Sequence, residues 1–123
     1  ASLIVSYVSQ DTSFLQGKLK TFSNQHNLPE PLFYALLRQL DLEREQFQKP
    51  MEEFSEGQKK KVLIAASLLT PAHLYIWDEP LNYIDIFSRM QIETLIQTYR
   101  PTMLIVEHDQ RFAQTIATKT LKL

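Results

Sequence analysis

The sequence predicts an α/β protein built on a parallel sheet, and three observations support this class. Short apolar runs that read as strands, such as residues 73–77 and 102–106, alternate with longer segments whose apolar residues recur at helical spacing. The helical segments between these strands have lengths that suit right-handed crossovers, which join parallel strands. The chain has 123 residues, 44% of them hydrophobic, which is enough for the core of one modest domain.

The first half is predicted to contain one strand and two helices. Proline separates the two helices, because it is tolerated at a helix start and not inside a helix. The expected order is a strand from Leu3 to Val8 that leads to Gln10, a loop over 11–17, a helix from Lys18 to about Asn27, a second helix after Pro31, and a charged, irregular stretch over 41–54 with room for one short helical turn.

The second half is predicted to alternate regularly between helix and strand. Pro71 and Pro101 end two of the helices, and the strand over 102–106 is apolar throughout, which is typical of a strand buried on both faces. The expected order is a helix from Ser55 to about Leu69, a strand over 73–77, a helix over 86–99, a strand over 102–106, a helix near 110–117 and a last short strand over 119–123.

The composition limits the classes of function. The formal net charge of -1 argues against nucleic-acid binding by bulk electrostatics, and the sequence contains no cysteine for a disulfide or a thiolate metal site. No apolar run is long enough to span a membrane, and the N-terminal residues do not have the pattern of a signal peptide. The chain opens with ASLIVSYVSQ, inside a predicted strand, so we expect it to be a fragment of a longer protein.

The sequence SEGQ at residues 55–58 has two interpretations. Ser55 and Gln58 have the spacing of a capping box, in which each side chain bonds the other residue's backbone amide. Gly57 is not explained by capping, since glycine in a helix costs roughly 0.5–1 kcal/mol relative to alanine. A close approach to the backbone would explain it, and a helix N-terminus with bare amides is suited to bind phosphate.

Two carboxylates follow the strand at 73–77. An Asp-Glu pair after a strand is often only a solvated turn, but the carboxyl ends of parallel strands are where such folds place their ligands. There Asp78 can hold a magnesium ion, and Glu79, on the other side of the strand, can orient or deprotonate an attacking water. The pair fits metal-assisted phosphoryl chemistry.

Three further features have a structural and a functional interpretation. His108, after the strand at 102–106, is either structural or a hydrogen-bond donor to a terminal phosphate, and Gln10 is either a polar loop residue or a ligand for a metal or a water. The lysines at 59–61 are expected on a solvated helix face, with Lys59 or Lys60 able to supplement a phosphate site. The sequence contains no G-x-x-x-x-G-K-[ST] loop, so it lacks a backbone cradle for the β-phosphate.

Taken in order, YVSQ, FSEGQKKKVLIAASLL, LYIWDEPLNYID and LIVEHD resemble the ATP-binding domain of the ATP-binding cassette (ABC) superfamily from its glutamine loop onward. The resemblance implies a partial P-loop NTPase fold, a parallel sheet with flanking helices plus the ABC helical subdomain, lacking the Walker A half. It divides the chain into a glutamine-loop segment over 1–17, a helical subdomain with the signature helix over about 18–70, and the C-terminal part of the ATPase core over about 71–123.

The resemblance also implies an ATPase that uses ATP and Mg²⁺ and works with a second ABC domain of the full-length chain. The isolated fragment is expected to be inactive for lack of Walker A. The implied roles are catalysis by Glu79 and His108, metal binding by Asp78 and Gln10, contact with ATP by Gln10 of the glutamine loop and Asp85 of the D-loop, and contact with the second domain's ATP by Ser55, Gly57 and Gln58. The sequence departs from the family pattern at Phe54, Glu56 and Glu107, and Glu56 brings a negative charge to the signature.

DEPLNYID is similar to the DEPTNHLD pattern of the ABC-F class, and the second half resembles the second domain of ABC-F proteins that protect bacterial ribosomes from antibiotics. This implies a cytoplasmic, ribosome-associated protein of antibiotic resistance or translation, with no direct membrane insertion. One alternative is the ATP-binding subunit of a membrane transporter. Another is a non-catalytic interaction fragment, for which bare sheet edges would favour a homo-oligomer or a swapped dimer.

Overall fold

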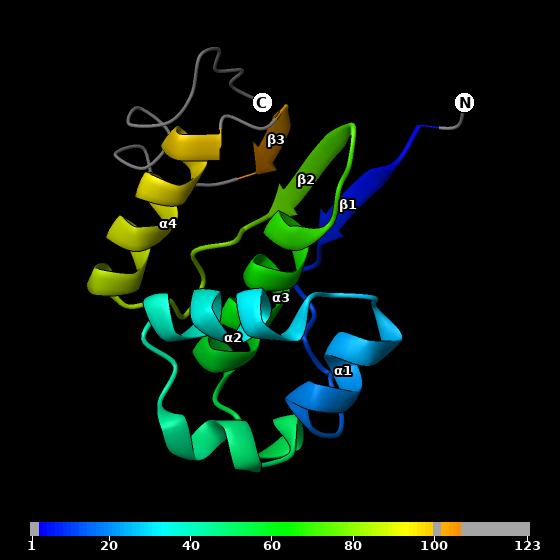
Figure 1. Ribbon diagram of the computed structural model, residues 1–123. Helices are drawn as coiled ribbons and strands as arrows, with labels where there is room; N and C mark the ends of the chain where they lie inside the picture. The colour runs from blue at the N-terminus through cyan, green and yellow to red at the C-terminus, as the bar shows by residue number, and fades with distance from the viewer. Residues whose placement is uncertain (1–2, 100–101, 107–123) are drawn as a thin grey trace.

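The structure is a computed structural model that describes residues 3–99 and 102–106 (Figure 1). It combines a small sheet with helices that pack beside and below it. The elements, in chain order, are β1 (Val5–Val8), α1 (Leu19–Gln25), α2 (Glu30–Gln39), the 3-10 helices η1 (Arg44–Gln48) and η2 (Met51–Glu53), α3 (Glu56–Leu69), β2 (Leu74–Asp78), α4 (Ile86–Tyr99) and β3 (Met103–Val106).

The sheet confirms the predicted α/β class with a parallel arrangement. Its three strands lie in the order β1-β2-β3, and both pairings are parallel. Val8 pairs with Trp77, and Asp78 pairs with Val106, so all three strands end at the same edge. Residues that follow these strands are therefore brought together, as the sequence predicts.

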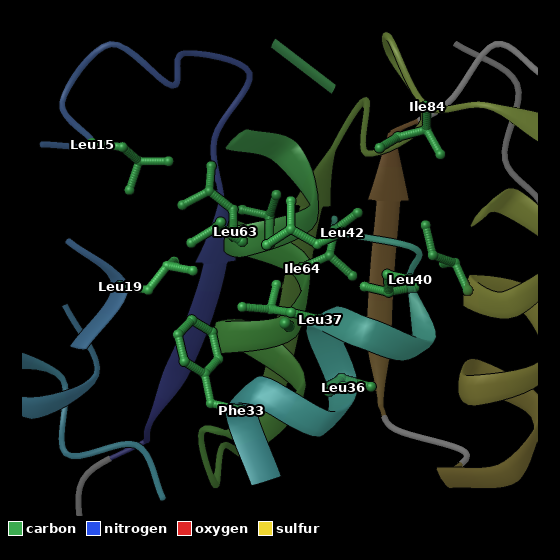
Figure 2. Close-up of a cluster of buried hydrophobic side chains, with 14 of the residues drawn as sticks. Leu15, Leu19, Phe33, Leu36, Leu37, Leu40, Leu42, Leu63, Ile64 and Ile84 are labelled. Carbon is green, nitrogen blue, oxygen red and sulfur yellow. The ribbon is translucent and has the colours of Figure 1, made fainter. Parts of the chain in front are cut away.

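The helix α3 occupies the centre of the fold because it packs on β1 on one side and on α2 on the other. Figure 2 shows the apolar side chains between these layers, including Leu37 of α2 and Ile64 of α3, both fully buried. Polar groups also join the layers: the buried Ser67 hydroxyl accepts a hydrogen bond from Trp77 Nε1 at 2.9 Å. Satisfied buried polar groups of this kind fix one packing of helix on sheet.

Most predicted elements are confirmed with small shifts at their ends. The helix over 86–99 has the predicted bounds, while the first strand is shorter than predicted. The second helix begins at Glu30 and takes Pro31 into its first turn, where the missing amide costs nothing. The irregular stretch over 41–54 contains two 3-10 helices, where one short turn was predicted.

One prediction about the sheet is wrong. The strand over 102–106 was expected to be buried on both faces, but in β3 Leu104 is 53% exposed and Val106 is 40% exposed. Leu104 and Val106 lie on the same face of β3, because side chains alternate along a strand, and the described residues leave that face exposed. The helix predicted near 110–117, the strand predicted over 119–123 and His108 lie outside the described residues. Within the described ranges, the helices are too short or too polar to cross a membrane.

Candidate functional site

The carboxyl edge of the sheet brings Gln10 and Asp78 into direct contact. Gln10 Nε2 donates to Asp78 Oδ1 at 3.0 Å, although 68 positions separate the two residues in the chain. Tyr7 adds a long contact from its hydroxyl to Asp78 Oδ2, at 3.4 Å. Both residues expected to hold a metal therefore lie side by side at the ends of β1 and β2.

Glu79 follows β2 in an unusual backbone conformation. Its φ is 49°, in the left-handed region, which costs a residue other than glycine about 1–3 kcal/mol. Hydrogen bonds hold it there: its amide donates to the Val106 carbonyl at 2.7 Å, its carbonyl accepts from the Asn82 amide at 3.3 Å, and its Oε2 accepts from Asn82 Nδ2 at 3.0 Å. The Glu79 carboxylate is thus held by the turn that follows it, whereas Asp78 is bonded to Gln10, and separate chemical roles for the two stay a prediction. The Val106 contact also places Glu79 at the end of the strand that leads to His108.

The start of α3 confirms the predicted capping box. The Gln58 amide donates to Ser55 Oγ at 3.1 Å, and the Ser55 amide donates to Gln58 Oε1 at 2.9 Å. Gln58 Oε1 also accepts from Gln46 Nε2 at 2.8 Å, which ties the helix start to η1. Ser55 and Gln58 therefore already stabilise the helix within this chain.

Gly57 is required by a close approach of the backbone, as its position in the first helical turn suggests. A Cβ built on Gly57 would lie 2.3 Å from the Tyr83 carbonyl oxygen. Tyr83 has a φ of 67° and belongs to the segment over 80–85, which we call the 80–85 turn. The group that approaches Gly57 in the structure is thus a carbonyl of the same chain, and phosphate binding here stays a prediction.

Asp85 ends the 80–85 turn and caps α4. Its Oδ2 accepts from the Ser88 amide at 3.0 Å, and its Oδ1 lies 3.2 Å from Lys61 Nζ. Partial burial alone would raise the pKa of Asp85, but the hydrogen bonds from Ser88 and the Lys61 ammonium outweigh burial and lower the pKa from 3.8 to about 2. The structure therefore gives Asp85 a structural role, and its contact with nucleotide stays a prediction.

This lowered pKa predicts an acid-dependent contribution to stability. Because the pKa is lower in the folded state, Asp85 stabilises the fold above pH 4 and loses this effect as the pH falls toward 2. Asp85→Asn keeps the cap but loses the charge, so we expect a loss of about 0.5 kcal/mol in the free energy of unfolding at pH 7 and no difference near pH 2. Chemical denaturation across this pH range measures it, with the exposed Glu45→Gln as control. A deficit that persists unchanged at pH 2 would contradict the assignment.

The prediction that the lysines at 59–61 form a solvated face is wrong. Lys60 is 1% exposed and Lys61 is 7% exposed, because α3 is covered on both sides. Lys60 Nζ donates to the Ser9 carbonyl at 2.9 Å and lies 3.5 Å from the Gln10 carbonyl oxygen. Each buried ammonium thus ties α3 to a segment that carries a candidate site residue.

Glu56, which departs from the family pattern, also contacts the segment after β1. Its Oε2 accepts from the buried Thr12 hydroxyl at 2.5 Å, and its Oε1 lies 3.8 Å from Lys59 Nζ. The negative charge brought to the helix start is therefore partly compensated within the chain. It also lies at a helix N-terminus, where the helix dipole favours an acid.

Sequence reasoning missed Tyr7, Thr12 and Asn82 as neighbours of the site, and it placed Lys60 at a phosphate and not against the backbone at Gln10. The contact of Asn82 with Glu79 could have been predicted from the sequence, since Asn82 lies only three residues after Glu79 in the same turn. The contacts of Tyr7, Thr12 and Lys60 span 44 or more positions in the chain, and no local pattern reveals them.

Asp78 and Gln10 can supply some of the ligands of a magnesium ion, and waters or phosphates would have to supply the others. Oxygen atoms from Asp78 and the Gln10 amide are the ligand types that Mg²⁺ prefers, and Mg²⁺ usually binds through one or two carboxylates together with waters and substrate phosphates. Within residues 3–99 and 102–106 there is no group of three or more His, Asp or Glu side chains that could hold a metal ion. The pair fits one side of a magnesium-phosphate site.

Known proteins resemble this chain over most of its length. The chain is 28% identical over 127 residues to YdiF of Bacillus subtilis, which covers 100% of this chain and 20% of YdiF. Human ATP-binding cassette sub-family F member 3 is 36% identical over 76 residues, 62% of this chain and 11% of that protein. In structure, a chain from a model of ribosome-bound archaeal Pelota and ABCE1 matches with a TM-score of 0.74 and 26% identity, over 93% of this chain and 20% of that chain.

These relatives are much longer than the chain, which spans about a fifth of YdiF and less of the human protein. The family model described as ABC transporter matches residues 2–82, which include the Gln10–Asp78 contact, the start of α3 and the first half of the 80–85 turn. The chain therefore belongs to the ABC transporter family.

Proposed function

We propose that the chain is part of an ABC-F-type ATPase and supplies the metal and water side of its ATP site. One observation carries the proposal: the side chains of Gln10 and Asp78 meet at 3.0 Å, at the edge of a parallel sheet where ligands bind. Membership of the ABC family and similarity to a sub-family F protein support it. In this proposal residues 1–17, about 18–70 and about 71–123 correspond to the glutamine-loop segment, the helical subdomain and the C-terminal core.

The residues of this edge have separate tasks. Asp78 and Gln10 hold Mg²⁺, which, when bound, neutralises charge on the phosphates of ATP. Glu79 accepts a proton from the attacking water, and Asn82 orients its carboxylate through the 3.0 Å hydrogen bond. His108, two residues after Val106, completes the site as a hydrogen-bond donor to the terminal phosphate.

The start of α3 faces the ATP of a second ABC domain. Ser55 accepts from the Gln58 amide, which leaves its own hydroxyl hydrogen to donate to a phosphate oxygen. The backbone amides near Gly57 add the partial positive charge of a helix N-terminus. In this proposal a longer protein supplies the phosphate loop of this domain and the second domain, as the greater length of the relatives permits.

The ribosome is the proposed partner, and the cytoplasm the proposed compartment. One structural neighbour comes from a model of ribosome-bound archaeal Pelota and ABCE1, and that neighbour is 26% identical to this chain. The similarity of DEPLNYID to the ABC-F pattern supports the finer proposal of a translation or antibiotic-resistance factor. A second cassette and an interdomain linker in the full-length sequence would agree with this partner, whereas a membrane-domain gene beside it would favour transport.

The ATPase proposal is tested with Asp78→Asn in the full-length protein. We expect the parental protein to hydrolyse ATP in a Mg²⁺-dependent manner. The variant should require at least about tenfold more Mg²⁺ for half-maximal rate, because loss of even an outer partner of a metal site costs tenfold or more. Phosphate release measured against Mg²⁺ concentration gives this value, and the exposed Asp41→Asn is the matched control. A parental protein without ATPase activity, or a variant with the parental Mg²⁺ requirement, would refute the proposal.

A further inference from the structure

Lys60 is a buried charge that the proposed function leaves without a task. It lies in the second turn of α3, a helix that packs on β1 and on α2, and it is 1% exposed. A buried ammonium is unfavourable unless hydrogen-bond acceptors replace its water, and long apolar side chains would fill the same space without that cost. The presence of lysine at this position is therefore explained by what its ammonium binds.

The ammonium binds the backbone on either side of a site residue. Lys60 Nζ lies 2.9 Å from the Ser9 carbonyl oxygen and 3.5 Å from that of Gln10. The side chain of Gln10 then extends to Asp78, where Nε2 donates to Oδ1 at 3.0 Å. Hydrogen bonds from Lys60 to this backbone, and from the Gln10 side chain to Asp78, thus connect α3 to the carboxylate at the end of β2 through the covalent structure of Gln10.

A second contact holds the same two segments together. The buried Thr12 hydroxyl donates to Glu56, the first residue of α3, at 2.5 Å. Lys60 and Glu56 lie four positions apart and therefore project from one face of the helix. These two attachments tie the segment over 9–12 to the start of α3.

We propose that Lys60 is a positioning residue, which places Gln10 against Asp78 and makes the magnesium site depend on the position of α3. This inference rests on the proposed function, because it assigns Lys60 a task within that site. Lys60 does not touch the nucleotide in this role and acts only through Gln10. Its removal should weaken the site for Mg²⁺ without removing the water-activating carboxylate.

The test uses the full-length protein and a double-mutant cycle of Lys60→Met with Gln10→Ala. The readouts are the Mg²⁺ concentration for half-maximal binding of a fluorescent ATP analogue, and the half-saturating Mg²⁺ and kcat for ATP hydrolysis. Lys60→Met should raise both Mg²⁺ values about fivefold or more with a smaller change in kcat, in the manner of an outer partner of a metal site. Because Lys60 acts through Gln10, the double variant should match Gln10→Ala alone.

Lys61→Met is the matched control, since it removes a buried lysine from the same helix and breaks an ion pair with Asp85 in place of the contacts with the Gln10 segment. It should lower the melting temperature without changing the half-saturating Mg²⁺. If Lys60→Met does not fold, Lys60→Gln replaces it with the same expected direction. The role of Lys60 would be overturned if the double variant raised the half-saturating Mg²⁺ by the product of the two single effects. It would also be overturned if a folded Lys60 variant had the parental Mg²⁺ requirement. A parental protein that binds no nucleotide with Mg²⁺ would instead refute the proposed function.

Discussion

Glu79→Gln in the full-length protein is expected to lower the rate of ATP hydrolysis by about 100-fold or more, since a general base contributes 10²–10⁴-fold to such reactions. Glutamine has nearly the same shape and can keep the hydrogen bond with Asn82, but it cannot accept a proton from water. The metal residues Asp78 and Gln10 are unchanged in this variant, so ATP binding should remain. Single-turnover phosphate release and equilibrium binding of labelled ATP measure the two effects separately.

The same variant also tests the proposed partner. A protein that binds ATP and cannot hydrolyse it should stay in its closed form, so Glu79→Gln with ATP should sediment with ribosomes more than the parental protein does. The exposed Glu45→Gln is the matched control and should behave like the parent in both assays. Hydrolysis by Glu79→Gln at the parental rate would show that another group activates the water. If Glu79→Gln loses hydrolysis completely but does not bind ribosomes, the proposed ATPase activity stands and the proposal that the ribosome is the partner is refuted.

Part of the geometry of the candidate site could be predicted from patterns in the sequence, while the roles of its residues stay predictions. The capping box of α3 could be predicted because its two members lie three residues apart, within one helical turn. The meeting of Gln10 with Asp78 could be predicted because parallel strands end at a common edge, whatever their separation in the chain. In both cases the regular geometry of a helix or a parallel sheet is enough to predict the contact, without knowledge of the tertiary fold.

The errors arise where tertiary packing decides the outcome. Three consecutive lysines read as a solvated face, but α3 is covered by β1 and by α2, so that Lys60 and Lys61 are buried with partners from other elements. The apolar run of β3 read as doubly buried, but a strand's own sequence does not show whether a layer covers each of its faces. The need for glycine at 57 was visible in the sequence, whereas the group that approaches it was not.

Gly57→Ala is expected to lower the free energy of unfolding by about 2 kcal/mol, within the range for overpacking a well-packed position. The added Cβ would lie 2.3 Å from the Tyr83 carbonyl oxygen, a backbone atom that cannot swing away as a long side chain can. Alanine favours the helix by up to about 1 kcal/mol over glycine, and the expected decrease in the free energy of unfolding already includes this opposing gain. Urea denaturation of parent and variant measures the difference.

The added Cβ clashes with the backbone of Tyr83 and not with its side chain, and this difference can be tested with a second variant. Tyr83→Ala should not rescue Gly57→Ala, because shortening that side chain leaves the carbonyl where it is. Gly17→Ala is an informative comparison: Gly17 has a φ of 78°, and beyond its chain neighbours no described residue lies within 4 Å of an added Cβ, so its cost is local backbone strain. Only Gly57→Ala should therefore displace the 80–85 turn and speed hydrogen exchange at the Ile84 amide, which is bonded to the Leu81 carbonyl at 3.1 Å. If Gly57→Ala is as stable as the parent and the turn stays protected, the contact between Gly57 and Tyr83 does not hold the turn against α3, and the glycine is needed for a ligand that approaches from outside the chain.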